Sequence, residues 1–560
     1  MSLIDTRHDQ MFPTLTADQI ATARRFASGA PRHYEAGAPL ASIGERNTPA
    51  FLILRGQVEV LRRDGAGRQD SVTTYGPGHI SGEVSQLAGK ASLVDLRAGE
   101  EGCEAISFCP AHLRALIIGS AEVGEIIMRA YILRRMALIE AGSGSVLIGG
   151  RNDPVLVRIE GFLAQNGYPY SSLDPYKESE GRELIERLGL TDDDLPLMLC
   201  PAGTVLKRPT TAEVGACLGI TPELSPDKLY DVAVIGAGPA GLATAVYAAS
   251  EGLSVLVLDA RSYGGQAGAS ARIENYLGFP TGISGHALAA RAFNQAQKFG
   301  AEIALPVTAE TLDCGGADRK PGDPLVLTLP GGKSVQARTV VIASGARYRK
   351  LAVDNLGLFE GAGVSYWASP VEARLCAGTE VALVGAGNSA GQAVVFLAPK
   401  VSRLHMVVRG PSLEASMSRY LIDRIAALPN VSLHFNSEVI ALRGDAATGL
   451  EGLEIRDNAT GKVTAQAIRT LFLFIGADPN ATWLSGCPVA QDEHGFVLTG
   501  EGWSDAPWPA FGRRPFPLET SVPGVFAIGD VRSGSTKRVA AAVGEGAQVV
   551  AALHRVLATS

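Results

Sequence analysis

Two glycine-rich turns in this chain have the spacing that binds a dinucleotide. In the first, an apolar run at 230–235 leads through a turn into the alanine-rich segment 242–252. The residues of this turn that we expect to contact the ligand are Gly236, Gly238, Pro239, Ala240 and Gly241. The glycines let the backbone approach a pyrophosphate, and the N-terminus of the following helix offers free N–H groups and a positive dipole. Asp259 ends the next apolar run, where its carboxylate can accept hydrogen bonds from an adenosine ribose, as in FAD.

The second turn differs from the first at the position that identifies the nucleotide. It follows the apolar run 381–384, and its expected contact residues are Gly385, Gly387, Asn388, Ser389 and Ala390. Arg409 ends the next apolar run, near the place where the first unit has its aspartate. Arginine cannot accept hydrogen bonds from ribose hydroxyls, but it pairs well with a 2′-phosphate. The pattern favours NADPH over NADH, and the alternative is that Arg409 is only a solvated charge at a strand end.

Alternating strands and helices must position these turns. From residue 229 to the end, the chain is rich in glycine and alanine and repeats strand, turn and helix, which is typical of doubly wound α/β domains. One tightly held flavin and one mobile nicotinamide donor would explain why a single chain needs two such turns.

The front of the chain has a different pattern. The run 51–63 alternates apolar and polar residues and indicates two short strands, with Gly56 at a turn or bulge between them. Further on, strands and helices alternate, and a polar stretch with prolines follows. The expected units are a mainly β domain at 1–118, a connecting helix at 119–144, an α/β domain at 145–220 and a linker at 221–228.

Composition and charge exclude several classes of protein. The chain has 560 residues, a net charge of −7 and no long basic block, which argues against a surface for nucleic acid or membrane. No run reaches about 18 uninterrupted apolar residues, so we expect no membrane span. The first ten residues, MSLIDTRHDQ, lack the pattern of a secretion signal. We expect a soluble, cytoplasmic protein without a metal site.

The seven cysteines are scattered along the chain, and no two of them form C-x-x-C. Their odd number and their spacing favour a reducing compartment and no disulfide framework. Cys200 and Cys217 could nevertheless lie close in space and form a functional pair. Cys376 is expected to be a small buried residue.

Two further segments carry a family resemblance. GGQAGASARIENYLGFP (264–280) and GVFAIGDVRSGSTKRVAAAVGEGAQV (524–549) are similar to the flavin-binding motifs of low-molecular-weight thioredoxin reductases. The resemblance covers about residues 229–560 and implies a Rossmann-like α/β fold with two dinucleotide-binding domains, of the pyridine nucleotide-disulfide oxidoreductase class. The implied units are an FAD domain in two parts, 229–345 and 468–560, and an NAD(P)H domain at 346–467.

Carried over position by position, the family's flavin contacts fall in both parts of the FAD domain. They are Gly265, Gln266, Asn275, Gly345, Gly529, Asp530, Arg538, Val539 and Ala540. Gln266 and Asn275 would bond the flavin or its ribityl arm, and Asp530 a ribityl hydroxyl. Residues 538–540 would open a helix whose positive end stabilises negative charge on reduced flavin. The resemblance also implies a homodimer.

The chain departs from this family at 363–370. There, thioredoxin reductases carry the C-x-x-C that takes electrons from the flavin and passes them to thioredoxin, and this chain has Trp367, Ala368, Ser369 and Pro370. A single thiol cannot perform two-electron disulfide exchange alone. The scaffold also resembles the thioredoxin-reductase-like ferredoxin or flavodoxin NADP reductases, which lack the dithiol and pass electrons directly from the flavin.

The leading hypothesis is therefore an FAD-dependent NADPH oxidoreductase whose electron acceptor is unidentified. A small protein such as ferredoxin, a quinone and oxygen are all open. Trp367 is a candidate for the flavin face, where it would stack on a ring or shield the flavin from oxygen. Two alternatives stay open: a flavin-based sensor with little turnover, and a disulfide reductase that uses other thiols.

The first domain resembles cyclic-nucleotide-binding domains, whose fold is a β-roll. FLILRGQVEV, YGPG and SGE follow one another in that family's order, and the resemblance implies that Gly82 and Glu83 bind a cyclic nucleotide ribose. The arginine that pairs with the cyclic phosphate in the family falls near Ser92, which carries no charge, although Lys90 or Arg97 could replace it. Either this domain binds a cyclic nucleotide, or it is a docking or dimerising module.

The middle domain resembles thioredoxin and glutaredoxin. Pro196 stands where that fold keeps a cis proline, and the active-site position at 148–154 contains no cysteine. The domain order closely resembles bacterial fusions of a cyclic-nucleotide-binding domain with a thioredoxin-reductase-like flavoprotein.

Overall fold

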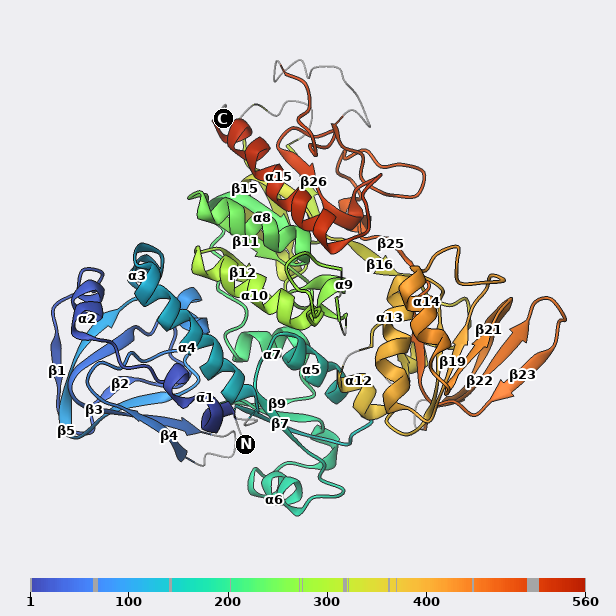
Figure 1. Ribbon diagram of the computed structural model, residues 1–560. Coiled ribbons are helices and arrows are strands. Elements are labelled where there is room, and N and C mark those ends of the chain that lie inside the picture. Colours follow the sequence, from blue (N-terminus) through green and yellow to red (C-terminus); the bar gives the residue numbers. More distant parts are fainter. Residues whose placement is uncertain are drawn as a thin grey trace.

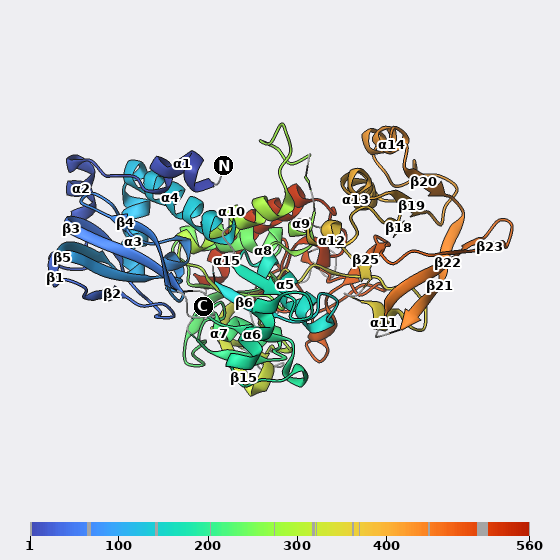
Figure 2. The same ribbon diagram turned by 90° about the horizontal axis from the view of Figure 1, so that it is seen from below.

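Four parts with separate sheets follow one another along the chain in the computed structural model (Figures 1 and 2). The first lies on the left of Figure 1 in blue, the second at the bottom centre in teal, the third at the centre and top in green and red, and the fourth on the right in orange. The structure describes residues 3–63, 69–140, 144–201, 203–270, 272–273, 275–315, 320, 322–360, 363–368, 370–445, 448–500 and 513–558.

The first part is an antiparallel sheet closed by helices, with strand order β1-β5-β3-β4 and β2 paired to β5. Its elements are α1 (Leu3–Met11), α2 (Ala17–Arg24), β1 (Arg32–Tyr34), β2 (Pro39–Ala41), β3 (Ala50–Arg63), β4 (Gln69–Tyr75), β5 (Asp95–Phe108), α3 (Pro110–Gly119) and α4 (Ala121–Glu140). The expectation of two strands over 51–63 is wrong, because β3 is one strand that pairs with β5 along most of its length. Gly56 lies at an irregularity in this pairing, with φ +70°, and an added Cβ would lie 2.1 Å from the carbonyl oxygen of Gly102.

The second part is a four-stranded sheet in the order β7-β6-β8-β9, in which β6 and β7 are parallel and β8 and β9 antiparallel to their neighbours. Its elements are β6 (Ser145–Ile148), α5 (Pro154–Gln165), β7 (Tyr170–Leu173), α6 (Ser179–Arg187), β8 (Leu197–Leu199), β9 (Val205–Lys207) and α7 (Thr211–Cys217). Helix α5 begins where the Asp153 carboxylate accepts the N–H groups of Val155 and Leu156. The Leu195–Pro196 peptide is cis, as expected. Of the connecting helix expected at 119–144, residues 141–143 lie outside the described residues.

The third part is built on a seven-stranded sheet whose parallel half has the order β12-β11-β10-β15, with β26 beside β15. Its elements are β10 (Leu229–Ile235), α8 (Pro239–Ser250), β11 (Val255–Leu258), α9 (Gly265–Gly268), α10 (Gly285–Lys298), β12 (Glu302–Ala304), β13 (Thr311–Asp313), β14 (Leu325–Leu329), β15 (Lys333–Ile342), β26 (Val525–Ala527) and α15 (Val539–Leu557). Every residue of β11 is buried, as is usual for a parallel strand covered on both faces.

The fourth part is a parallel sheet in the order β17-β24-β18-β19-β20, next to a three-stranded antiparallel sheet. Its elements are β17 (Val364–Ser365), α12 (Pro370–Leu375), β18 (Glu380–Val384), α13 (Asn388–Leu397), β19 (Arg403–Val407), α14 (Arg419–Ala426), β20 (Val431–His434), β21 (Ser437–Asp445), β22 (Gly449–Asp457), β23 (Val463–Gln466) and β24 (Leu471–Leu473). An expected boundary at 467 would assign β24 to the third part, and this is corrected by the pairing of β24 with β18. The antiparallel strands β16 (Ala346–Tyr348) and β25 (Ala477–Pro479) join the third and fourth parts (Figure 1).

Two disulfides overturn the expectation of no disulfide framework, and one of them confirms the alternative that Cys200 and Cys217 lie close in space. Cys200, directly after β8, is bonded to Cys217 at the end of α7, and Cys314 is bonded to Cys487. The paired cysteines lie 17 and 173 residues apart, so the fold and not their spacing brings them together. Among the described residues, no helix is long and apolar enough to cross a membrane.

Candidate functional site

The first glycine turn connects β10 to α8 and is closed to any larger residue. Gly236 has φ +113°, and an added Cβ would lie 2.2 Å from the carbonyl oxygen of Ala343. A Cβ on Gly241 would lie 1.9 Å from the carbonyl oxygen of Gly236. Helix α8 begins at Pro239 after the N-cap Gly238, which provides no side-chain cap. Its first N–H groups are therefore available to a phosphate, and the turn fits the pyrophosphate of FAD.

Asp259 lies directly after β11, beside this turn. Its Oδ2 accepts the N–H of Ala237 at 2.9 Å, and its Oδ1 accepts those of Arg261 and Ser262 at 2.9 and 3.3 Å. Burial raises the pKa of the Asp259 carboxyl, and these N–H donors act against that rise. A carboxylate offers about four acceptor sites, so one is left for a ribose hydroxyl. The hydrogen bond of Asp259 to an adenosine ribose stays a prediction.

The loop after β11 folds back over the turn. The N–H of Gly264 donates to the carbonyl of Ala237 at 2.7 Å, and an added Cβ on Gly265 would lie 3.1 Å from Cα of Gly238. The Gln266 amide donates to the carbonyl of Ala346 at 3.0 Å, just after Gly345, whose φ is +66°. Asn275 is exposed and makes no hydrogen bond among the described residues, so its contact with flavin stays a prediction.

A third group of predicted residues comes from the end of the chain. An added Cβ on Gly529 would lie 3.0 Å from Cβ of Ala240 and 3.9 Å from Cβ of Ala542, so this residue sits between the N-terminal turns of α8 and α15. Arg538 is the N-cap of α15 without a side-chain cap, and Val539 and Ala540 form its first turn. Two helix N-termini thus meet at one place, which suits an anionic cofactor.

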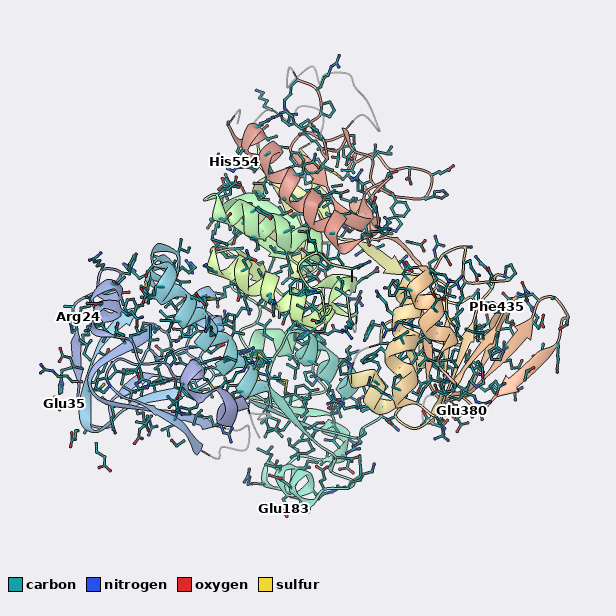
Figure 3. The ribbon with its side chains drawn as sticks, in the orientation of Figure 1. Arg24, Glu35, Glu183, Glu380, Phe435 and His554 are labelled. Carbon is teal, nitrogen blue, oxygen red and sulfur yellow. A yellow bond between two sulfur atoms is a disulfide. The ribbon has the colours of Figure 1, made fainter. Side chains whose placement is uncertain are left out.

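The two helices stay in contact along their length. A Cβ on Gly546 would lie 2.4 Å from the carbonyl oxygen of Ala240, and His554 Nε2 lies 2.7 Å from Glu251 Oε2 at the far end (Figure 3). Nothing in the spacing of the sequence pointed to Glu545, whose carboxylate accepts the N–H of Gly529 at 2.6 Å. Its place in α15, within the quoted C-terminal motif, is the signal that could have found it.

Asp530 follows Gly529 and is partly buried. Burial raises the pKa of its carboxyl, and the positive charge of Lys537 opposes this. The Lys537 ammonium donates to the backbone carbonyl of Asp530 and, at 2.9 Å, to the hydroxyl of Ser535. The contact of Asp530 with a ribityl hydroxyl stays a prediction.

The second glycine turn joins β18 to α13. Gly385 has φ +149°, and an added Cβ would lie 2.4 Å from the carbonyl oxygen of Phe474. Gly387 is the N-cap of α13, Ala390 is buried and Ser389 is exposed. The side-chain oxygen Oδ1 of Asn388 accepts the N–H of Ser418 at 2.7 Å and so connects the turn to the start of α14. Here too the first N–H groups of the helix are available to a phosphate.

Arg409 lies two residues beyond the end of β19. It is exposed, and among the described residues it makes no ion pair. A guanidinium without a protein partner can pair with a 2′-phosphate of NADPH.

Trp367 lies between β17 and α12. Its indole N–H donates to Glu372 Oε1 of α12 at 2.9 Å, and the side chain is half-buried. Ala368 and Cys376 are buried in the core of the fourth part, as expected for Cys376. Burial raises the pKa of the Cys376 thiol to about 11. Ser369 lies outside the described residues, and Pro370 opens α12.

In the first part, Gly82 and Glu83 lie under helix α4. An added Cβ on Gly82, which has φ +111°, would lie 2.6 Å from the hydroxyl of Tyr131. Glu83 is 9% exposed, and its Oε2 lies 3.8 Å from Nη1 of Arg135. The Ser92 hydroxyl donates to the carbonyl of Val94 at 2.7 Å.

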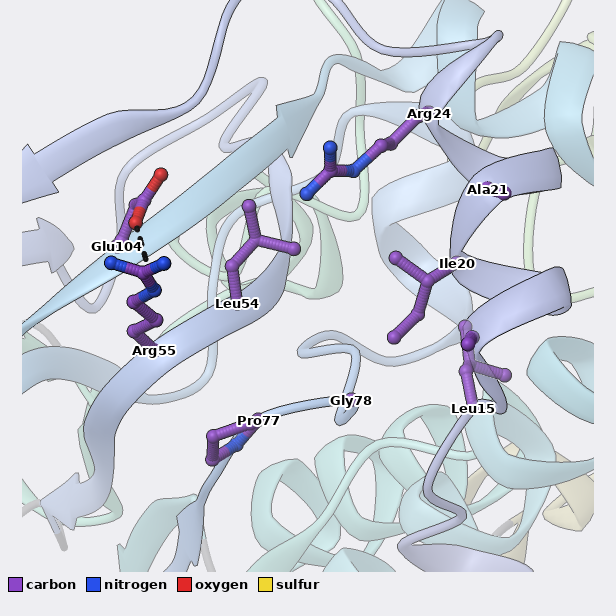
Figure 4. A pocket seen from close by; sticks show the side chains of 10 residues that line it. Leu15, Ile20, Ala21, Arg24, Leu54, Arg55, Pro77, Gly78 and Glu104 are labelled. Atoms are coloured by element: carbon purple, nitrogen blue, oxygen red, sulfur yellow. Dashed lines mark ion pairs between the residues drawn. The ribbon is translucent and has the colours of Figure 1, made fainter.

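A cavity of about 500 Å³ opens elsewhere on this part, between α2 and β3 (Figure 4). Ile20 and Leu54 line it from opposite sides, and Arg55 pairs with Glu104 at its rim at 3.8 Å. Gly82 and Glu83 do not line this cavity.

Much of this chain is similar to known proteins. Residues 230–546 match the family model of the pyridine nucleotide-disulphide oxidoreductases, over more than half of the chain. The chain belongs to this family. Residues 31–119 match the cyclic nucleotide-binding domain.

The oxidoreductase is similar to several thioredoxin reductases. It is 30% identical to the thioredoxin reductase of Ureaplasma parvum over 58% of its own length and 96% of that protein. It is 31% identical to NADPH-dependent thioredoxin reductase 3 of Arabidopsis thaliana over 59% of each chain. The crystal structure of T. acidophilum thioredoxin reductase superposes with a TM-score of 0.51 and 28% identity, covering 59% of this chain and 99% of that one.

The chain is thus a thioredoxin-reductase-like, FAD-dependent NAD(P)H oxidoreductase whose cofactors are FAD and NADPH. The glycine turns described above fit both groups.

Proposed function

We propose that this oxidoreductase takes electrons from NADPH and passes them from its flavin directly to an acceptor outside the chain. The observation that supports the proposal is the segment from β17 to the start of α12, where Trp367 and Pro370 stand at the two positions at which the resemblance implies the family's cysteines. FAD, when bound, supplies the redox chemistry: its ring can accept a hydride from a nicotinamide and pass the electrons to a second partner.

The chain's own residues bind and orient the two nucleotides. The N-termini of α8 and α15 and the turn at 236–241 hold the anionic centre of FAD, and Asp259 holds its adenosine ribose. The turn at 385–390 and Arg409 hold NADPH, with Arg409 selecting the 2′-phosphate. Trp367 is fixed by Glu372 and shields the flavin ring from oxygen.

The three free cysteines give little support to an internal dithiol at the flavin. Cys376 is only 1% exposed and lies in the core of the NADPH domain, and Cys103 and Cys109 belong to the first domain. We propose a cytoplasmic location and a homodimer, as in the family, and an acceptor such as ferredoxin, a quinone or oxygen.

A second candidate rests on the Cys200–Cys217 disulfide, which would make the middle domain an internal acceptor. The order and directions of β7, β6, β8 and β9 are those of the thioredoxin fold, so we propose that this domain is thioredoxin-like.

The position of this disulfide favours the first candidate. Helix α7 lies against residues 305–306, since the Thr221 hydroxyl donates to the carbonyl of Leu305 at 2.6 Å and a Cβ on Gly215 would lie 2.6 Å from Cδ of Pro306. The N–H of Asp259 donates to the carbonyl of Ala304 at 3.3 Å. The disulfide-bearing helix therefore lies on the adenosine side of the FAD site, away from the end that carries out redox chemistry.

Turnover by cysteine variants separates the two candidates. NADPH oxidation would be followed with ferricyanide, ferredoxin, a quinone and a disulfide as acceptors, in the wild type, in Cys200→Ser/Cys217→Ser and in Cys376→Ser. Direct transfer predicts that all three proteins reduce the same non-disulfide acceptor at similar rates. Loss of that activity in Cys200→Ser/Cys217→Ser, with FAD still bound and still reduced by NADPH, would support the second candidate.

A further inference from the structure

The turn 165–168 of the middle domain makes hydrogen bonds to the loop 261–265, which lies beside Asp259. The Ser262 hydroxyl donates to Oε1 of Gln165 at 3.0 Å, and the Asn166 amide donates to the carbonyl of Arg261 at 3.3 Å. A Cβ on Gly167 would lie 3.1 Å from the hydroxyl of Tyr263. The N–H groups of Arg261 and Ser262 are the same ones that bind the Asp259 carboxylate. The loop is therefore held by Asp259 on one side and by the middle domain on the other.

The first domain holds this turn through Arg135 of α4. Its Nε donates to the carbonyl of Gly167 at 3.0 Å, and its guanidinium lies 4.9 Å from the ring centre of Tyr168. The Tyr168 hydroxyl in turn donates to the carbonyl of Leu218, in the middle domain, at 3.1 Å. Arg135 thus bridges two domains with a hydrogen bond and a cation–π contact.

Glu83 is the acidic partner of Arg135 within the first domain, beside this junction. The side chains of Arg135 and Glu83 are 15% and 12% exposed, and Nη1 and Oε2 lie 3.8 Å apart. Among the described residues, neither of these two atoms has a hydrogen-bond partner. A buried pair of this kind adds little stability, but it fixes the direction in which the guanidinium points.

A second connection runs parallel to the first. The Lys90 ammonium lies 5.2 Å from the ring centre of Phe293 in α10, and Phe293 stacks on Tyr263 with ring centres 4.3 Å apart. Tyr263 immediately precedes Gly264, whose N–H donates to the carbonyl of Ala237 in the pyrophosphate turn at 2.7 Å. Lys90 therefore faces the FAD domain directly, whereas Glu83 reaches the middle domain only through Arg135.

The same segment does not fit a cyclic phosphate in the way the family resemblance implies. Ser92 carries no charge, and its hydroxyl is used by Val94. Arg97 lies on β5 opposite Glu59 of β3. Lys90 is directed to an aromatic ring of the FAD domain, and burial lowers the pKa of its ammonium to about 8.

We propose that Glu83 and Arg135 are positioning residues of the FAD site. Together they fix the turn 165–168, and this turn fixes the loop 261–265 against the pyrophosphate turn. The Gly-Glu motif of the first domain then serves as an internal clamp on the flavin nucleotide and not as a reader of cyclic nucleotide ribose. The clamp requires only that FAD binds, so it does not depend on which acceptor receives the electrons.

The rate of FAD release from the holoprotein tests this clamp. Release would be followed by the rise in flavin fluorescence after dilution, without NADPH or acceptor, so failure of the proposed electron transfer cannot affect the result. Arg135→Met and Glu83→Gln should each release FAD roughly 10-fold faster, because coupling between sites is typically of that size. Arg135→Lys should restore part of the wild-type rate. The double variant should be no faster than Arg135→Met, since both residues act through one contact.

Arg129→Met is the matched control, because Arg129 lies on the same helix and, within the described part of the chain, pairs only with Glu125 on the exposed surface. It should release FAD at the wild-type rate. If Arg135→Met does not fold, Gln165→Ala and Ser262→Ala remove the hydrogen bond between the middle domain and the loop 261–265 instead. Both variants should release FAD faster than the wild type.

Two results would overturn the proposal. One is an unchanged FAD release rate in Arg135→Met or, if that variant does not fold, in both Gln165→Ala and Ser262→Ala. The other is saturable binding of cyclic AMP to the full chain that is lost in Glu83→Gln, since Glu83 would then be free to bind a ribose.

Discussion

The indole N–H of Trp367 donates to Oε1 of Glu372 at 2.9 Å. This hydrogen bond fixes an aromatic side chain in the segment where the similar thioredoxin reductases are expected to carry a dithiol. Neither Trp367 nor Pro370, which stand at the two cysteine positions of C-x-x-C, can form a thiolate, so we expect this segment to stack on the flavin or shield it and not to exchange disulfides.

Removing the ring of Trp367 should expose the flavin to oxygen. Trp367→Ala is expected to raise NADPH oxidation in air on the order of tenfold, because a closed site suppresses such side reactions. Trp367→Phe keeps a ring but loses the bond to Glu372, so its leakage should lie between those of wild type and Trp367→Ala. Oxygen uptake with NADPH as sole donor measures this, and equal uptake in all three proteins would remove the shielding role.

Two glycines in helix α15 form a matched pair for the packing of the FAD domain. A Cβ on Gly546 would lie 2.4 Å from the carbonyl oxygen of Ala240, whereas a Cβ on Gly544 would meet no atom within 4 Å. Gly546→Ala should cost about 1–3 kcal/mol by overpacking and should lower the FAD content, because Ala240 belongs to the pyrophosphate turn. Gly544→Ala should be neutral or stabilising by about 0.5–1 kcal/mol. Thermal unfolding and the flavin-to-protein ratio measure both, and equal behaviour of the two variants would contradict the packing argument.

Arg409 should determine the choice between NADPH and NADH. A hydrogen-bonded charge pair is worth about 1.5–3 kcal/mol, so Arg409→Gln should raise KM for NADPH roughly 10- to 100-fold and leave KM for NADH nearly unchanged. Arg403→Gln is the control, since Arg403 is an exposed arginine at the start of the same strand. Steady-state kinetics with both donors decide the point. An equal rise in KM for NADPH and for NADH would show that Arg409 does not recognise the 2′-phosphate.

Cys109 should be the most reactive thiol of the protein at neutral pH. Its Sγ lies 3.0 Å from Nδ1 of His112 at the N-terminus of α3. Burial raises the pKa of this thiol, but hydrogen bonds from His112, Ser28 and Ala111 outweigh it and lower the pKa to about 7. The thiolate is the reactive form, so the alkylation rate should climb as pH rises through about 7.

Alkylation followed by peptide mass spectrometry distinguishes the free thiols. Cys376, with a pKa raised to about 11, and the buried Cys103 should stay unmodified under the same conditions. His112→Ala should move the midpoint for Cys109 upward. A wild-type midpoint near that of an ordinary thiol, about 8.5, would contradict the role of His112.

The two nucleotide turns could be predicted because backbone sterics alone dictate them. Gly236 and Gly385 need positive φ and have no room for a Cβ. Only glycine fits such positions, so the glycine spacing can be recognised in the sequence. The Arg135–Glu83 pair and the Cys314–Cys487 disulfide could not be predicted in the same way, and the closeness of Cys200 and Cys217 could only be named as one possibility. They join residues of different elements, and only the packing of whole domains decides which side chains meet. The place of β24 was missed for a similar reason, since three apolar residues fit either sheet and only the pairing with β18 assigns them.

An anaerobic titration of the purified yellow protein with NADPH tests direct electron transfer most directly. A flavin takes up two electrons, so about one NADPH per FAD should bleach the visible absorbance completely, with no thiol released. About two NADPH per FAD, with loss of the Cys200–Cys217 disulfide on mass analysis, would show that the middle domain stores electrons and would contradict direct transfer to an external acceptor.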